Sequence, residues 1–80
     1  QMAFESCRSH HERAVSIFQD LGLRYRAAQA LVDLGVMARD ARQSRAHVYW
    51  DRAVGIAAQD GDPQMVEDFR KRVAQLRRDA

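Results

Sequence analysis

Residues 50–61, WDRAVGIAAQDG, repeat the pattern of residues 11–22, HERAVSIFQDLG, thirty-nine positions further along the chain. Arg13-Ala14-Val15 corresponds to Arg52-Ala53-Val54, and each stretch ends on a glycine, Gly22 or Gly61. A period of about 20–50 residues built from helical units is typical of repeat proteins, in which each unit buries its apolar face by stacking on its neighbour. The register therefore predicts a stacked helical array, of which a little more than one period is visible.

Apolar residues recur every three or four positions along nearly the whole chain, which predicts four helices. The first helix ends just before Gly22, because glycine adopts the left-handed backbone conformation of a helix stop most easily. The second helix runs over residues 24–41. Ser44 caps the third, which ends at Asp60-Gly61, and the fourth opens with an Asp62 cap and Pro63 in its first turn. The expected buried stripes are Phe4, Cys7, His11, Ala14, Phe18 and Leu21; Ala28, Leu31, Leu34, Gly35 and Ala38; Ala46, Tyr49, Trp50, Ala53, Ile56 and Ala57; and Met65, Val66, Phe69, Val73 and Leu76.

The composition is that of one small globular domain of 80 residues, with 46% hydrophobic and 30% charged side chains. A single cysteine, Cys7, excludes an internal disulfide, and no apolar run approaches the ~20 residues of a membrane span. We therefore expect a cytoplasmic protein without a membrane partner. The chain opens on Gln1, which suggests a piece of a longer protein, and its arginine-rich composition with Lys71 as the sole lysine is typical of a GC-rich bacterial genome.

The residues around the second and third segments resemble the tetratricopeptide repeat family. Leu34-Gly35 matches the Leu-Gly pair of the family's first helix, and Ala46, Trp50 and Ala53 match the small–aromatic–small triplet of its second helix. Asp62-Pro63 matches the turn that opens the next unit. The physical logic agrees, since glycine and alanine let two helices approach closely while the tryptophan fills the space between them.

The resemblance implies an all-α fold of antiparallel helix pairs stacked as a right-handed superhelical repeat. Residues 1–22 would be the second helix of a preceding unit, 24–61 a full repeat, and 63–79 a polar-faced capping helix. Two features depart from the family pattern: the usual glycine between the paired helices is replaced near Arg42, and the usual tyrosine of the first helix is Ala38. The interval from Gly35 to Ala46 is also one residue shorter than in the family.

In that family the first helices of each pair line a groove that binds a partner, so the resemblance implies a scaffold for protein–protein or peptide recognition. The groove-facing residues would be Gln29, Val32, Val36, Arg39, Asp68, Lys71, Gln75 and Arg78. Their net-basic character predicts an acidic or extended partner segment. The alternative is that these residues only form solvated helix faces. The family's polar clamp on a peptide carboxylate is not expected here, because Val32 and Val36 occupy positions where that clamp needs polar side chains.

Nothing in the sequence predicts catalysis, a cofactor or a metal. His10 and His11 are adjacent, and adjacent helical residues point about 100° apart, so they cannot close on one ion. We expect His11 to be a packed residue and Cys7 to be a buried structural cysteine. No glycine-rich phosphate loop or serine nucleophile motif is present.

Two other functions fit parts of the sequence. Residues 29–36 resemble a helix-turn-helix, which would break at Gly35 and set Arg39, Arg42 and Arg45 against DNA phosphates. Against this alternative, residues 37–39 continue a helix without a turn. Nucleic acid is therefore not expected as a partner unless this alternative holds. A purely structural role is the second: an exposed apolar flank would let the chain form a homo-oligomer. The residues that could supply this flank are Phe4, Ile17, Phe18, Tyr25 and Met37.

Overall fold

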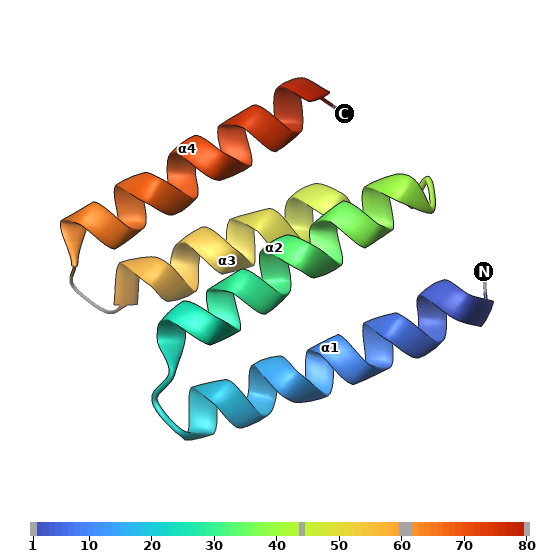
Figure 1. The fold of residues 1–80 in the computed structure, drawn as a ribbon, viewed down its shortest axis with the longest axis horizontal. Helices are drawn as coiled ribbons and strands as arrows, with labels where there is room; N and C mark the ends of the chain where they lie inside the picture. The colour runs from blue at the N-terminus through green and yellow to red at the C-terminus, as the bar shows by residue number, and fades with distance from the viewer. Residues whose placement is uncertain (1, 44, 60–61, 80) are drawn as a thin grey trace.

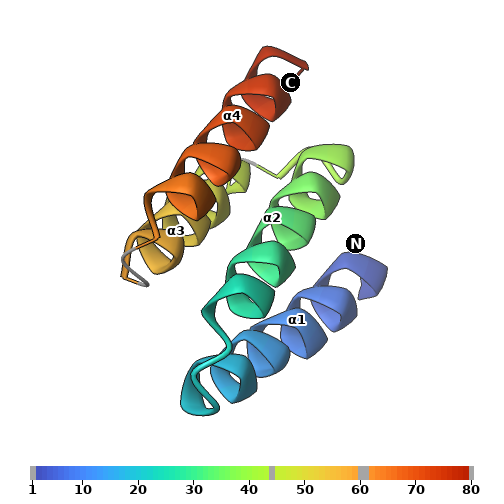
Figure 2. The same cartoon turned by 60° about the vertical axis from the view of Figure 1, so that its left-hand side comes forward.

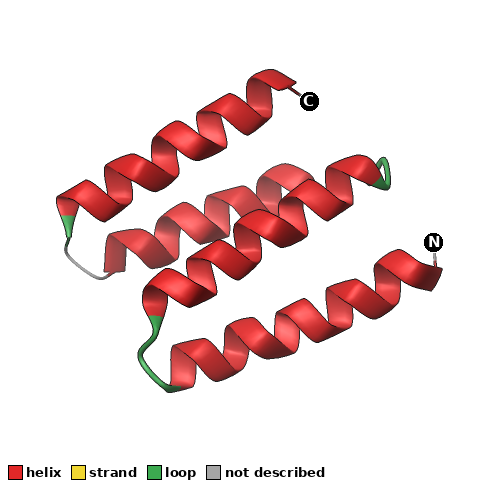
Figure 3. Ribbon diagram, in the orientation of Figure 1, coloured by secondary structure: helices red, strands yellow, loops and turns green. Residues whose placement is uncertain are grey.

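The protein is a chain of four α-helices joined by short turns (Figures 1 and 3). The computed structural model describes residues 2–43, 45–59 and 62–79, with side chains from residue 5 onward. The helices are α1 (Met2–Asp20), α2 (Arg24–Asp40), α3 (Ala46–Gln59) and α4 (Pro63–Asp79), and the described ranges contain no strand. The predicted all-α fold of four helices is confirmed. The roles expected of the Phe4 side chain, Ser44, Asp60 and Gly61 lie outside the described residues.

The helices form an open, flat array instead of a closed bundle. Each helix runs antiparallel to the one before it, so α2 and α4 lie parallel to each other (Figures 1 and 2). Contacts join α1 to α2, α2 to α3, α3 to α4 and α2 to α4, while α1 does not reach α4 over the part that the structure describes. The Cα positions span 36 × 30 × 12 Å. Because α2 contacts all three other helices, it forms the centre of the domain.

The core lies mainly between α2 and α3. All six residues expected to be buried on α3 are buried, as are the five expected on α2. Ala27 and Val32 are buried as well, because α2 is covered from three sides. The pattern of small residues alternating with Trp50, Leu31 and Leu34 gives the close interdigitation that stabilises a small domain.

Trp50 and Gly35 determine how closely α2 and α3 approach. The Trp50 side chain is 1% exposed, and its Nε1 donates a hydrogen bond of 3.3 Å to the Val32 carbonyl oxygen. A Cβ atom at Gly35 would lie 2.2 Å from that Nε1, so only glycine fits beneath the indole ring. Helix α2 continues through Gly35 to Asp40. The helix-turn-helix interpretation, which needs a break at Gly35, is therefore wrong.

Helices α1 and α2 each end in a turn that contains one residue in the left-handed backbone conformation. Gly22 has φ 74°, and its N–H donates to the Gln19 carbonyl while the Leu23 N–H donates to the Phe18 carbonyl. Arg42 has φ 59°, a backbone conformation that favours glycine. The same pair of bonds closes α2, from the N–H of residue 42 to the carbonyl of residue 39 and from 43 to 38. Both helices thus end in the same six-residue capping motif, at Gly22 without strain and at Arg42 with it.

The start of α4 follows the prediction. The Asp62 Oδ1 accepts the backbone N–H of Gln64 at 3.0 Å and that of Met65 at 3.4 Å, which caps the helix ahead of Pro63. Phe69 and Val73 are buried against the other helices, while Met65, Val66 and Leu76 are only half-buried. These three are less covered than expected because α4 lies at an edge of the array.

Helix α1 differs most from its prediction. Val15, which the expected stripe omitted, is the residue buried against the core, while Leu21 is 67% exposed and Cys7 is exposed. The expectation of a buried cysteine is wrong, because the backbone of α1 packs closely on α2 alone and Cys7 lies on the part of α1 that stays exposed. The two copies of the repeated stretch also differ in burial: Ala53 is fully buried, whereas its counterpart Ala14 is half-buried.

Candidate interaction surface

The predicted groove residues lie on α2 and α4, two parallel helices that contact each other. Val32 is 3% exposed, so its side chain cannot touch a partner, and its inclusion among the groove residues was wrong. The physical reason is that α2 has three helical neighbours and little free circumference. The remaining α2 members are half-buried and the α4 members are exposed; they are Gln29, Val36, Arg39, Asp68, Lys71, Gln75 and Arg78.

One predicted residue, Gln29, bonds across to α4, and its partner is an arginine that the sequence analysis missed. Arg72 Nη1 donates to the Gln29 Oε1, and the Gln29 Nε2 donates in turn to the Asp33 Oδ1 at 3.0 Å. The Arg72 Cζ lies 5.1 Å from the centroid of the Phe69 ring, within the range of a cation–π contact. Arg72 therefore fixes the polar edge where α2 meets α4. Its position three residues after the core residue Phe69 was the available signal.

A hollow of about 260 Å³ opens between the first turns of α2 and α4. We call it the Tyr25 hollow; its lining residues are Tyr25, Asp62, Gln64, Met65, Asp68, Phe69 and Arg72. Tyr25 is 52% exposed, and its ring centroid is 5.5 Å from that of Phe69 with the planes tilted by 59°. The hollow thus has an aromatic wall, part of which is buried and part open to solvent.

Tyr25 also borders two neighbouring hollows. One, of about 240 Å³, lies where α1 ends against α2 and is lined by Phe18, Tyr25, Arg26, Gln29, Ala30 and Asp33. The other, at the first turn of α2, is lined by residues 22–26. A single exposed aromatic side chain therefore stands at the junction of three depressions formed by α1, α2 and α4. We call the combined area the Tyr25 surface.

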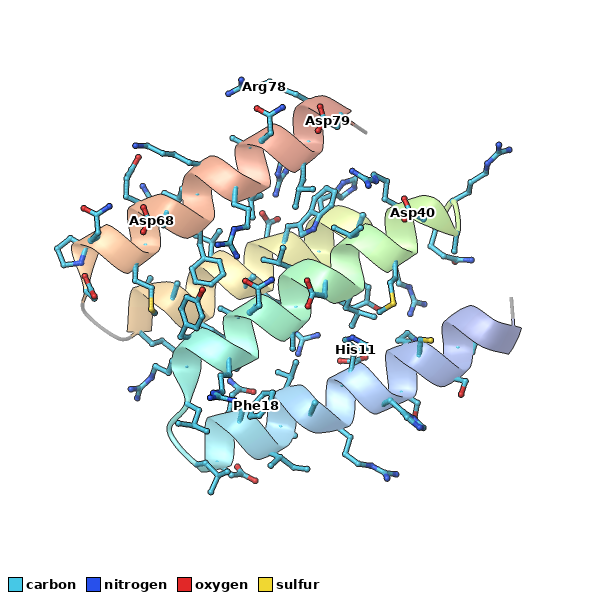
Figure 4. All side chains as sticks on the ribbon, in the orientation of Figure 1. His11, Phe18, Asp40, Asp68, Arg78 and Asp79 are labelled. Carbon is cyan, nitrogen blue, oxygen red and sulfur yellow. The ribbon has the colours of Figure 1, made fainter. Side chains whose placement is uncertain are left out.

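None of the basic residues predicted to face a groove lines the Tyr25 hollow. Arg39 Nε lies 3.3 Å from the Oδ1 of the adjacent Asp40, and Arg78 extends outward at the far end of α4 from Asp68 (Figure 4). The charged groups that line the Tyr25 hollow are two carboxylates and one guanidinium, so its formal charge is 1 − 2 = −1. Arg39 and Arg78 lie in the last turns of α2 and α4, whereas the hollow lies toward the other end of these helices.

Ion pairs tie α1 and α3 together away from the Tyr25 surface. Arg52 Nη1 lies 3.1 Å from the Glu12 Oε1, and Arg77 of α4 pairs with Asp51. Within α1, Arg8 reaches both Glu5 and Glu12, and the hydrogen bond that it donates to the Glu5 carboxylate is the main reason that the pKa of Arg8 is raised. The pairs between helices join α1 to α3 and α3 to α4, and exposed pairs of this kind contribute little to stability.

The described histidine and cysteine side chains belong to no metal-binding cluster. His11 Nδ1 lies 3.0 Å from the carbonyl oxygen of Cys7, one turn earlier in the same helix. Over the described ranges, no three His, Cys, Asp or Glu side chains gather closely enough to hold a metal ion. Over the same ranges, none of the helices is both long and apolar enough to span a bilayer. A further hollow, of about 370 Å³, is lined by Ala58, Pro63, Val66, Glu67 and Arg70, but it has no aromatic side chain in its lining.

Comparison of the chain with protein-family models, with curated proteins and with solved structures found no match.

Proposed function

We propose that this chain is a module of tetratricopeptide type that binds a protein or peptide partner on the Tyr25 surface. The open array supports the proposal, because α2 and α4 lie side by side in parallel, as the first helices of successive units do in that family. In the same correspondence α1 and α3 are second helices, and α4 is the cap. The exposed residues of α4 are all polar or charged, apart from Pro63, as suits a helix that covers the end of an array. The tight Gly35–Trp50 contact between α2 and α3 also follows the logic of the resemblance.

The observation that carries the proposal is the exposure of Tyr25 among three hollows. An aromatic side chain that is half-exposed at the junction of depressions can bury a large area on a partner at a low cost in side-chain entropy. Tyrosine is also among the residue types that dominate the binding energy of protein interfaces. The hollows on either side would receive the partner's neighbouring side chains.

Selection of a displayed library of random 12-residue peptides on the immobilised protein tests this proposal. Peptides that bind through the Tyr25 surface should lose at least about tenfold in affinity on Tyr25→Ala, because truncating an interface tyrosine commonly costs more than about 1.4 kcal/mol. The matched control is Val48→Ala on α3, since Val48 is 53% exposed but lines none of the three hollows. Peptides that are equally sensitive to both substitutions, or to neither, would place binding elsewhere.

A second candidate function is self-association through the exposed end of α1. Ile17 is 49% exposed and Leu21 67% exposed, and Leu23 continues this apolar strip into the turn. Sedimentation equilibrium of the wild type and of Leu21→Glu would measure it. A dimer that Leu21→Glu dissociates supports this function, and a wild-type monomer at about 1 mM excludes it.

A further inference from the structure

The sign of the charge in the Tyr25 hollow identifies the kind of side chain that it would accept. The carboxylates of Asp62 and Asp68 lie in its lining, on the first turns of α4. Between residues 62 and 68 the chain carries three acidic side chains and no basic one, and the basic residues of α4 begin at Arg70. The hollow therefore lies at the acidic end of α4, and the basic residues lie toward its other end.

Neutral donors hold both carboxylates. Asp68 Oδ1 accepts the side-chain amide of Gln64 at 2.9 Å, and Asp62 Oδ1 accepts the backbone N–H groups of Gln64 and Met65. Amide donors orient a carboxylate without cancelling its charge. These bonds orient both side chains; the helix N-terminus offsets part of the Asp62 charge, whereas Asp68 lies in the second turn and is bonded only to a neutral amide.

The one cation in the lining is already engaged. Arg72 donates to the Gln29 Oε1 and lies over the Phe69 ring, so its guanidinium is held on the α2 side of the hollow. Tyr25, by contrast, is half-exposed and lines the same hollow as the two aspartates. An exposed aromatic face beside two carboxylates attracts a cation by both ion pairing and cation–π interaction.

From these contacts we infer that the Tyr25 hollow accepts a lysine or arginine side chain of a partner segment, with the aliphatic stem against Tyr25 and Met65 and the charged group at Asp62 and Asp68. The inference rests on the proposed function and reverses the sign of the partner expected from the sequence. A hollow of about 260 Å³ has room for one long side chain, and the apolar wall with an anionic rim matches the two halves of such a side chain.

The test uses the Tyr25-dependent peptides from the library selection and a charge-neutral variant of the hollow. Asp62→Asn combined with Asp68→Asn removes both charges but keeps an acceptor at each position, and asparagine caps helices about as well as aspartate. The matched control is Asp40→Asn, an exposed carboxylate at the opposite end of the array from Asp68 (Figure 4). Thermal melts establish that the variants fold.

We expect the Tyr25-dependent peptides to be enriched in lysine or arginine and to bind about 3- to 10-fold more weakly to the doubly neutralised variant, with no change on Asp40→Asn. Replacing the enriched basic residue by norleucine should produce the same loss. Tyr25-dependent peptides that are acidic or neutral, or that ignore the neutralisation, would overturn this inference and leave the proposed function intact. If no selected peptide depends on Tyr25, the inference and the binding surface both fail.

Discussion

Replacing Gly35 by alanine tests the packing of α2 on α3 directly. In an exposed helix interior this change stabilises a protein by up to about 1 kcal/mol, because glycine is the poorer helix former. At Gly35 the new methyl group would lie 2.2 Å from Trp50 Nε1 and 2.5 Å from its Cδ1. The indole ring is 1% exposed and cannot swing into solvent, so the helices must separate or the ring must leave its position.

The expected change in the free energy of unfolding combines two losses, overpacking and a broken hydrogen bond, with one gain in helix propensity. Overpacking a filled core costs about 1–3 kcal/mol. Displacing the ring also breaks the bond from Trp50 Nε1 to the Val32 carbonyl, and leaving those buried groups unpaired costs about 1–3 kcal/mol. Subtracting the helix-propensity gain of about 1 kcal/mol leaves a net loss of about 3 kcal/mol, within a range of about 1–5. This is a large part of the stability of an 80-residue domain.

Gly55→Ala is the matched control, because Gly55 also lies inside a helix but a Cβ there meets nothing within 4 Å. It should raise the free energy of unfolding by about 0.5–1 kcal/mol. Urea denaturation followed by far-UV circular dichroism measures both variants, and Trp50 fluorescence reports the ring's environment. In a Trp50→Phe background the smaller ring should reduce the Gly35→Ala penalty by about 1 kcal/mol or more.

Gly35→Ala should therefore lower the free energy of unfolding, and Gly55→Ala should raise it. If Gly35→Ala stabilises the protein as Gly55→Ala does, the indole does not lie on Gly35 and the described packing of α2 on α3 is incorrect. If the penalty is unchanged by Trp50→Phe, the strain comes from another contact.

The capping and ion-pair contacts yield three further predictions. Gly22→Ala should lower the free energy of unfolding by about 1–2 kcal/mol, and Arg42→Gly should raise it by about 0.5–1, because both positions are left-handed; thermal melts that shift in the same direction would contradict this. Asp62→Ala should cost about 1 kcal/mol in the same assay, whereas Asp62→Asn should be close to neutral; an equal cost for both would argue against the capping bonds. Arg52→Ala should lower stability by about 0.2–1 kcal/mol at low salt through its ion pair with Glu12, and the loss should fade in about 1 M sodium chloride; a salt-independent loss would assign it to packing.

The sequence located the candidate surface only in part. It selected α2 and α4, and it named Gln29 and Asp68, which contribute to the hollows around Tyr25. It missed Arg72, because the stripe carried over from the resemblance lies about one residue away from the stripe of α4 that meets α2. It also did not locate the two aspartates at the Tyr25 hollow, because a list of charges along a helix does not say which of them line one hollow.

Local rules written in the sequence determined the four helices and their ends. Spacing of three and four residues, Gly22 at a left-handed turn and the Asp62-Pro63 start each act within one or two turns of chain, so they can be recognised without a fold. The burial of α2 and α3 followed too, because apolar periodicity marks a face that neighbours cover on one side or more.

Only the tertiary structure decided how many sides of each helix are covered. Val32 is buried because the central helix α2 has three neighbours, and Cys7 is exposed because α1 lies at an edge. The packing of α4 on α2 likewise brings two aspartates to the same hollow as Tyr25. These outcomes depend on the distances between helices that are far apart in sequence. Periodicity gives the direction of an apolar face, but the number and position of its neighbours come from packing alone.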